Sequence, residues 1–221
     1  MSEDSRPIIH IGMPKTATTT LQQNLFSDTK TFFPIGRYGA GGDIVASEII
    51  RELLWEGIFL DELSYKSRKK VYKQEIERLL FIANKKNLCP VISQECFGIP
   101  SRFHSDYSII FERLRDLLGE CQILMLIREQ ESWLKSFYST FVTDSGGTLS
   151  FKDFIFINEN IPFHELNYFR SLDYYHIVSI LERYFSKIIV RSFEEVSDDF
   201  SNQISELMKL LNIQINLLEV E

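Results

Sequence analysis

The sequence contains few cysteines, and their spacing argues against the common disulfide and zinc motifs. Cys89, Cys96 and Cys121 are an odd number, and no Cys-x-x-Cys pair occurs. A disulfide framework or a zinc site needs more cysteines at closer spacing. We therefore expect buried free thiols in a reducing compartment. His164 and His176 also have no ligand spacing with Cys, Asp or Glu, so the sequence predicts no metal site.

Long apolar runs are missing as well. No run approaches the roughly 18 apolar residues that suggest a membrane-spanning helix. The first seven residues, MSEDSRP, are polar and acidic and do not resemble a signal peptide. The sequence therefore predicts a cytoplasmic protein with no transmembrane segment.

An excess of positive charge is also absent, because the formal net charge is −7. This charge argues against non-specific binding of nucleic acid or anionic membranes. Any anionic ligand must then be bound by a few positioned cations and backbone dipoles. The 221 residues contain no Pro/Gly-rich linker and no internal repeat, so we expect one domain over residues 1–221.

Four short apolar runs have the character of buried strands. They are PIIHIG (7–12), CPVISQ (89–94), CQILMLI (121–127) and KIIVRS (187–192). Runs without alternation favour a parallel sheet that is covered on both faces, and segments with helical periodicity separate them. We predict a P-loop-like α/β/α domain of three layers, with a central parallel sheet of about four to five strands. His10 lies inside the first run and is expected to be a hydrogen-bonded core residue.

The first run leads through a threonine-rich loop into a helix that should begin near Thr18. The N–H groups of such a strand–loop–helix turn converge on one point, where the helix dipole adds partial positive charge. Lys15 supplies a full positive charge, and Thr18 and Thr19 supply hydroxyl donors. The segment therefore predicts a phosphate site. A helix cap, in which Thr16 or Thr18 satisfies the first N–H groups, is the structural alternative.

The loop differs from that of nucleoside triphosphatases, whose sequence is GxxxxGK[ST]. Lys15 precedes both the threonines and the helix, and no Gly-Lys-Ser/Thr occurs. No strand-terminal Asp is available for magnesium. A metal-free phosphate or phosphosulfate site is thus favoured over a nucleoside triphosphate site.

The order Pro-Lys-Thr-x-Thr-Thr, residues 14–19, resembles the 5′-phosphosulfate loop of sulfotransferases that use 3′-phosphoadenosine 5′-phosphosulfate (PAPS), particularly bacterial members acting on carbohydrates. After the third run, Arg128 leaves the strand end and Ser136 follows eight residues later. The guanidinium offers a planar fork for a phosphate. This pair resembles the 3′-phosphate signature of the same family. The resemblance implies that the nucleotide is bound by Gly12, Pro14, Lys15, Thr16, Ala17, Thr18, Thr19, Arg128 and Ser136.

The resemblance also implies an activity, the transfer of a sulfuryl group from PAPS to a hydroxyl of a carbohydrate or glycoconjugate. Lys15 is the candidate to neutralise the leaving phosphate. Glu95 follows the second run directly, where carbohydrate sulfotransferases similar to this chain have a catalytic glutamate. His104 is the alternative base, because aryl and steroid members use a histidine somewhat further on. A carboxylate is a modest base unless it is partly desolvated.

Other functions are also compatible with the sequence. Family loops commonly have Gly where this chain has Ala17, and a catalytically silent protein that binds PAPS or its product PAP is one alternative. A P-loop kinase or NTPase is another. Residues 32–70 are expected to form part of the wall of the acceptor site, and their Arg37, Tyr38 and Trp55 suit either a sugar or core packing. Phe193 and Glu194 replace the Tyr-Glu of related sequences and are expected to support the sheet edge.

Overall fold

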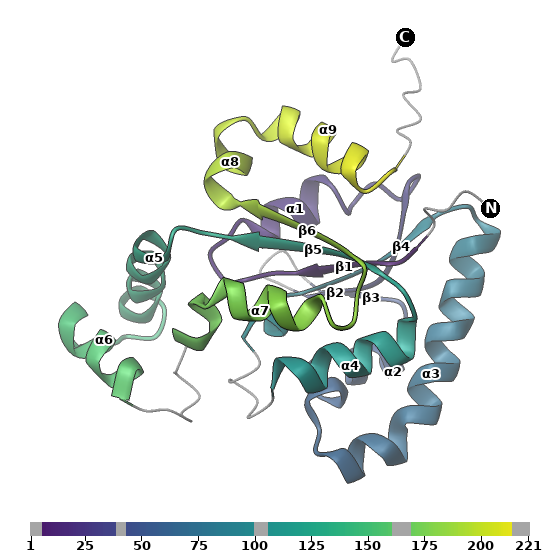
Figure 1. Cartoon of the computed structure of the whole chain (residues 1–221), viewed down its shortest axis with the longest axis horizontal. Coiled ribbons are helices and arrows are strands. Elements are labelled where there is room, and N and C mark those ends of the chain that lie inside the picture. The colour runs from purple at the N-terminus through teal and green to yellow at the C-terminus, as the bar shows by residue number, and fades with distance from the viewer. Residues whose placement is uncertain (1–5, 39–42, 100–105, 161–168, 214–221) are drawn as a thin grey trace.

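In the computed structural model, which describes residues 6–38, 43–99, 106–160 and 169–213, a central sheet lies between two layers of helices (Figure 1). Six strands form the sheet in the order β3-β2-β4-β1-β5-β6. All neighbours are parallel except β2 and β3. The strands are β1 (Ile8–Ile11), β2 (Phe32–Tyr38), β3 (Ile44–Val45), β4 (Cys89–Gln94), β5 (Gln122–Ile127) and β6 (Lys187–Ser192).

One face of the sheet packs against α1 (Thr18–Asn24), α8 (Phe193–Asp198) and α9 (Phe200–Leu210). The other face packs against α2 (Glu48–Trp55), α3 (Glu62–Lys85), α4 (Tyr107–Leu118) and α7 (Tyr174–Leu181). The helices α5 (Gln130–Thr143) and α6 (Phe151–Asn160) lie beyond one end of the strands (Figure 1). Three short 3₁₀ turns complete the described chain: η1 (Gly57–Phe59), η2 (Glu95–Gly98) and η4 (Phe169–Leu172).

The central strand β1 shows why continuous apolar runs form this fold. Ile8 belongs to the core under α1 and α9, whereas Ile9 and Ile11 belong to the core on the opposite face. Successive side chains of a strand point to opposite faces, so a strand between two helical layers must be apolar on both. The prediction of a three-layer α/β domain is confirmed.

His10 is the polar exception in β1, and its predicted core role is confirmed. It is fully buried, and its Nδ1 lies 2.8 Å from the Ser93 hydroxyl oxygen. Gln22 of α1 donates to the same hydroxyl at 2.8 Å. Burial lowers the pKa of His10 to about 3, so the ring is neutral at ordinary pH. The three side chains connect α1 to the two central strands.

The sheet has six strands rather than the four to five expected, because β2 and β3 were not predicted. The β2 sequence FFPIGRY contains Pro and Gly, which are unusual within strands. The pairing of β2 with β4 shifts register between Pro34 and Gly36, and this irregularity accommodates both residues. The strand β3 is only two residues long.

The segment 32–70 therefore builds the edge of the sheet and the first helices of one layer. Arg37 is only 8% exposed, and its Nη1 donates to the carbonyl oxygen of Gln22 at 2.5 Å. Arg37 thus binds a carbonyl in the last turn of α1, where such groups lack a partner within the helix. This contact supports core packing as the role of Arg37. Trp55 lies about half exposed on α2. Within the described ranges, no helix is both long and apolar enough to cross a membrane.

Candidate functional site

Three sequence motifs come together at the carboxyl edge of the sheet. Ile11 at the end of β1 pairs with Gln94 of β4 on one side and with Met125 of β5 on the other. The residues that follow these three strands, Gly12, Glu95 and the segment from Arg128, therefore lie along one edge. In parallel sheets ligands bind outside this edge, near a reversal of strand order. Here the reversal is at β1, which lies between β4 and β5.

In the loop after β1, three successive backbone carbonyl oxygens accept hydrogen bonds from side chains. The Met13 carbonyl accepts hydrogen bonds from the hydroxyls of Thr16 at 2.7 Å and Thr18 at 3.2 Å. The Pro14 carbonyl accepts from Trp133 Nε1 at 2.6 Å, and the Lys15 carbonyl accepts from Arg128 Nη1 at 2.9 Å. These bonds fix the path of the loop and satisfy three of its acceptors.

The first turn of α1 lacks a side-chain cap. Its N-cap residue is Ala17, which has no side-chain acceptor, and the turn contains no acidic residue. The hydroxyls of Thr16 and Thr18 donate to the Met13 carbonyl, and the cap position is Ala17 with no side-chain cap hydrogen bond, so the predicted alternative of a threonine cap is not what the structure shows. An uncapped helix N-terminus presents N–H groups and partial positive charge to an anion.

Two residues of the loop have left-handed backbone conformations, Lys15 with φ of 67° and Ala17 with φ of 61°. The Lys15 side chain is exposed and forms no ion pair with any residue that the structure describes. Left-handed conformations of non-glycine residues cost free energy and are typical of functional turns. Here they reverse the chain between β1 and α1, so that Lys15 stands beside the uncapped helix end.

Gly12 lies where β1, α1 and η2 pack closely against one another. A Cβ atom on Gly12 would lie 2.6 Å from Thr18 Oγ1 and 3.2 Å from Glu95 Cγ. A Cβ atom on Gly98 would lie 2.5 Å from the Gly12 carbonyl oxygen. The two glycines thus allow the turn that carries Glu95 to pack directly against the loop after β1.

Glu95 lies in a partly desolvated position next to a cation. Burial raises the pKa of its carboxyl group, and the positive charge of Lys15 opposes this rise. Phe97 and Ile99, which follow Glu95 closely in the sequence, are both buried. The structure therefore places a carboxylate with a raised pKa within electrostatic range of Lys15, although 80 positions separate them in sequence.

Arg128 lies beside the loop, and Ser136 lies further along α5. Trp133, which donates to Pro14, is one helical turn before Ser136, so both residues belong to the same side of α5. Ser136 is half-buried, as is Arg128. The Nη1 of Arg128 is bonded to Lys15, whereas its Nη2 forms no hydrogen bond within the described residues.

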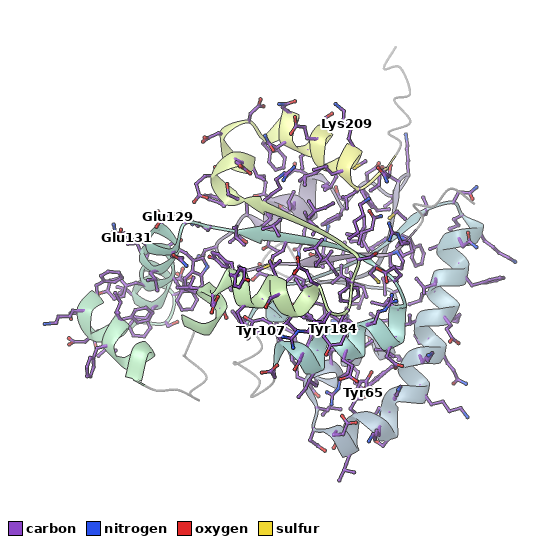
Figure 2. The ribbon with its side chains drawn as sticks, viewed as in Figure 1. Tyr65, Tyr107, Glu129, Glu131, Tyr184 and Lys209 are labelled. Atoms are coloured by element: carbon purple, nitrogen blue, oxygen red, sulfur yellow. The ribbon has the colours of Figure 1, made fainter. Side chains whose placement is uncertain are left out.

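The N-terminus of α5 is occupied by the chain itself. The Glu129 carboxylate accepts the N–H groups of Glu131 at 2.9 Å and Ser132 at 2.7 Å. Hydrogen bonds from Ser132 and from the backbone lower the pKa of Glu129. Figure 2 shows Glu129 and Glu131 at this helix end, beyond the carboxyl end of β5. An anion at Arg128 must therefore contact the guanidinium and not the helix terminus.

The sequence did not predict that Arg128 and Glu129 contact the side chains of Phe193, Glu194 and Tyr174. The guanidinium carbon of Arg128 lies 4.4 Å from the centroid of the Phe193 ring. The Glu194 carboxylate accepts from the N–H of Glu129 at 3.2 Å, and the Tyr174 hydroxyl donates to the Arg128 carbonyl at 2.8 Å. The expectation that Phe193 and Glu194 merely support the sheet edge was thus incomplete. No spacing rule links them to Arg128, since α5, α6, η4 and α7 lie between β5 and β6 in the sequence.

Some predicted positions add less. His104, the predicted alternative base, lies outside the described residues. Thr19 is half-buried in the first turn of α1. Within the described residues, no cluster of three or more His, Cys, Asp or Glu side chains is arranged to hold a metal ion. The three cysteines are free.

The solved structures that share this fold include two sulfotransferases. A sulfotransferase from Alicyclobacillus acidocaldarius superposes with a TM-score of 0.65 at 18% sequence identity, over 98% of this chain and 87% of that one. The sulfotransferase domain from the curacin biosynthetic pathway superposes with a TM-score of 0.56 at 15% identity, over 96% of this chain and 75% of that one. No family model and no curated protein matches the sequence.

Proposed function

We propose that this protein is a PAPS-dependent sulfotransferase that acts on a hydroxyl group of a carbohydrate or glycoconjugate. The observation that carries the proposal is the contact between two anion-binding elements, the uncapped N-terminus of α1 with Lys15 and the guanidinium of Arg128. They follow adjacent strands and meet at the Lys15 carbonyl, an arrangement that supports a single site for one doubly phosphorylated nucleotide. The two structural neighbours, both sulfotransferases, support the same reaction class.

The residues present fit such a nucleotide. Among the residues that the structure describes, no side chain caps the N–H groups at the start of α1, which suits the 5′-phosphate end of the donor. The hydroxyls of Thr16 and Thr18 fix the loop by donating to the Met13 carbonyl. Thr19, in the first turn of α1, can donate its hydroxyl to the phosphate. Arg128, with Nη2 unbonded among the described residues, and Ser136 would hold the 3′-phosphate.

The donor, when bound, supplies an activated sulfuryl group on a phosphate leaving group. Glu95 accepts the proton of the acceptor hydroxyl as the new S–O bond forms and the S–O bond to the phosphate breaks. Lys15 stabilises the negative charge that develops on the departing phosphate oxygen. A raised carboxyl pKa makes Glu95 a better base than an exposed glutamate. Positioning and electrostatics would supply most of the rate enhancement, as in phosphoryl transfer.

The nucleotide requirement is tested by isothermal titration calorimetry with adenosine 3′,5′-bisphosphate. We expect saturable binding without magnesium, and weaker binding of adenosine 5′-monophosphate, which lacks the group assigned to Arg128. Absence of heat at high micromolar bisphosphate would overturn the proposal. ATP hydrolysis that depends on magnesium would instead support the kinase or NTPase alternative.

The transfer step needs a separate experiment, because binding alone is also expected of a silent PAPS-binding protein. Labelled PAPS is incubated with a panel of mono- and oligosaccharides and with phenolic and steroid alcohols as comparison acceptors. We expect label transfer to a saccharide, and no transfer by Glu95→Gln. Tight bisphosphate binding without transfer to any acceptor would identify the silent alternative.

A further inference from the structure

Arg128 and Phe193 occupy equivalent places at the ends of two neighbouring strands. Ile127, the last residue of β5, pairs with Ser192, the last residue of β6. Arg128 and Phe193 are therefore the first residues past each strand and lie side by side. The guanidinium carbon is 4.4 Å from the centroid of the Phe193 ring, a distance typical of a cation–π contact.

The peptide unit after Arg128 is held on both sides. Its carbonyl oxygen accepts a hydrogen bond from the Tyr174 hydroxyl at 2.8 Å. Its N–H group, that of Glu129, donates to the Glu194 carboxylate at 3.2 Å. Burial raises the pKa of Tyr174, so its hydroxyl remains a donor at neutral pH. The side chains of two other helices thus fix the backbone from which Arg128 projects.

The Arg128 side chain is also constrained at its tip. Its Nη1 donates to the Lys15 carbonyl, and one face of the guanidinium covers Phe193. Its Nε is buried and has no partner within the described residues. Nη2 is then the nitrogen left for a ligand, and its direction is set before any ligand binds. A side chain ordered in advance loses less conformational entropy on binding.

We propose that Phe193 is a positioning residue that holds the Arg128 guanidinium for a 3′-phosphate and so sets the preference for nucleotides carrying that group. The inference rests on the proposed function above. Phe193 acts through the guanidinium that lies over its ring, which it keeps beside the Lys15 carbonyl.

The experiment measures a ratio of affinities. Dissociation constants for adenosine 3′,5′-bisphosphate and adenosine 5′-monophosphate are determined by calorimetry for the wild type, Phe193→Ala, Phe193→Leu and Phe193→Tyr. We expect the preference for the bisphosphate to fall about tenfold in Phe193→Ala and less in Phe193→Leu, which keeps apolar contact but has no π face. Phe193→Tyr keeps the ring and should preserve the preference.

Two controls separate positioning from stability. Phe200→Ala removes another half-buried phenylalanine, which packs on the core under α9 and not on Arg128. We expect it to lower the melting temperature without changing the affinity ratio. In an Arg128→Ala background, Phe193→Leu should no longer affect the ratio, because the group that it positions is gone.

The outcomes distinguish the two proposals. A wild type that prefers the bisphosphate, together with folded Phe193→Ala and Phe193→Leu proteins that keep the full preference, overturns the role of Phe193 alone. If Phe193→Ala does not fold, Phe193→Leu decides the question. A wild type that binds both nucleotides equally overturns the proposed function and this role with it.

Discussion

The Nη1 atom of Arg128 lies 2.9 Å from the carbonyl oxygen of Lys15, although the two residues are 113 positions apart in the sequence. The bond joins the end of β5 to the loop after β1. It also ties the orientation of one cationic side chain to the backbone of the other. A change at either residue is therefore expected to affect the binding of both ends of one ligand.

Arg128→Ala should weaken the binding of adenosine 3′,5′-bisphosphate about 10- to 100-fold, as expected for loss of charge-assisted hydrogen bonds. The effect on adenosine 5′-monophosphate should be smaller, and calorimetry with both ligands measures the difference. Arg128→Lys, which keeps the charge but not the planar fork, should fall between wild type and alanine. Arg183→Ala, at an exposed arginine, serves as the control. Unchanged bisphosphate affinity in Arg128→Ala would remove this residue from the site.

Gly12→Ala should destabilise the fold by about 1–3 kcal/mol, as overpacking in a filled site does. The new methyl group would lie 2.6 Å from Thr18 Oγ1 and 3.2 Å from Glu95 Cγ, so the loop after β1 and η2 must separate. Nucleotide affinity should fall together with the melting temperature. Gly146→Asn is the control, because open space surrounds Gly146 and asparagine tolerates its positive φ. A Gly12→Ala protein with wild-type stability would contradict the close packing.

Ala17→Gly should raise stability by about 1 kcal/mol, because alanine pays a steric cost in the left-handed conformation that glycine does not. In a chain of this length the melting temperature should rise by about 2–4 °C. Nucleotide binding should be retained, since related loops have glycine at this position. Asn87→Gly, also at positive φ, should gain less because asparagine already tolerates this region. A lower melting temperature for Ala17→Gly would show that the backbone here is not left-handed.

The carboxyl group of Glu95 should make stability fall as the pH rises. Burial raises its pKa in the folded state, so the folded protein retains a proton that the unfolded chain releases. Its contribution is fully present below the unfolded pKa and is lost as the pH passes through the folded pKa. Glu95→Gln should therefore be at least as stable as the wild type near neutral pH, while transferring no sulfuryl group. Thermal melts of both proteins from about pH 4 to about pH 8 measure the difference, and a strongly destabilised Glu95→Gln would refute it.

His10 should produce the opposite trend at acidic pH. Its folded-state pKa is lowered to about 3, so the folded protein excludes a proton that the unfolded chain binds. The stabilising contribution is complete above the unfolded pKa of about 6.5 and is lost as the pH falls toward 3. Between about pH 6 and pH 4 the wild type should lose up to about 1 kcal/mol per pH unit relative to His10→Asn. Urea unfolding at these pH values tests this, with His176→Asn as an exposed control; parallel pH curves for wild type and His10→Asn would contradict it.

The sequence by itself determined the layered α/β class, four of the strands and the places where chemistry follows them. Continuous apolar runs are buried on both faces wherever they occur, and this rule needs only local information. The same logic located Gly12, Glu95 and Arg128, because each comes directly after such a run. It failed for β2, because Pro34 and Gly36 are unusual within strands, and the strand forms through its pairing with β4.

Only the tertiary structure decided how these residues act on one another. The raised pKa of Glu95 depends on its burial beside the loop after β1, and the opposing charge is that of Lys15. The orientation of Arg128 depends on Phe193, which is adjacent because β5 pairs with β6. Sequence spacing carries no record of such neighbours, since strand order is set by packing of the whole sheet. Desolvation and charge–charge interactions act over a few ångströms of space, whatever the distance along the chain.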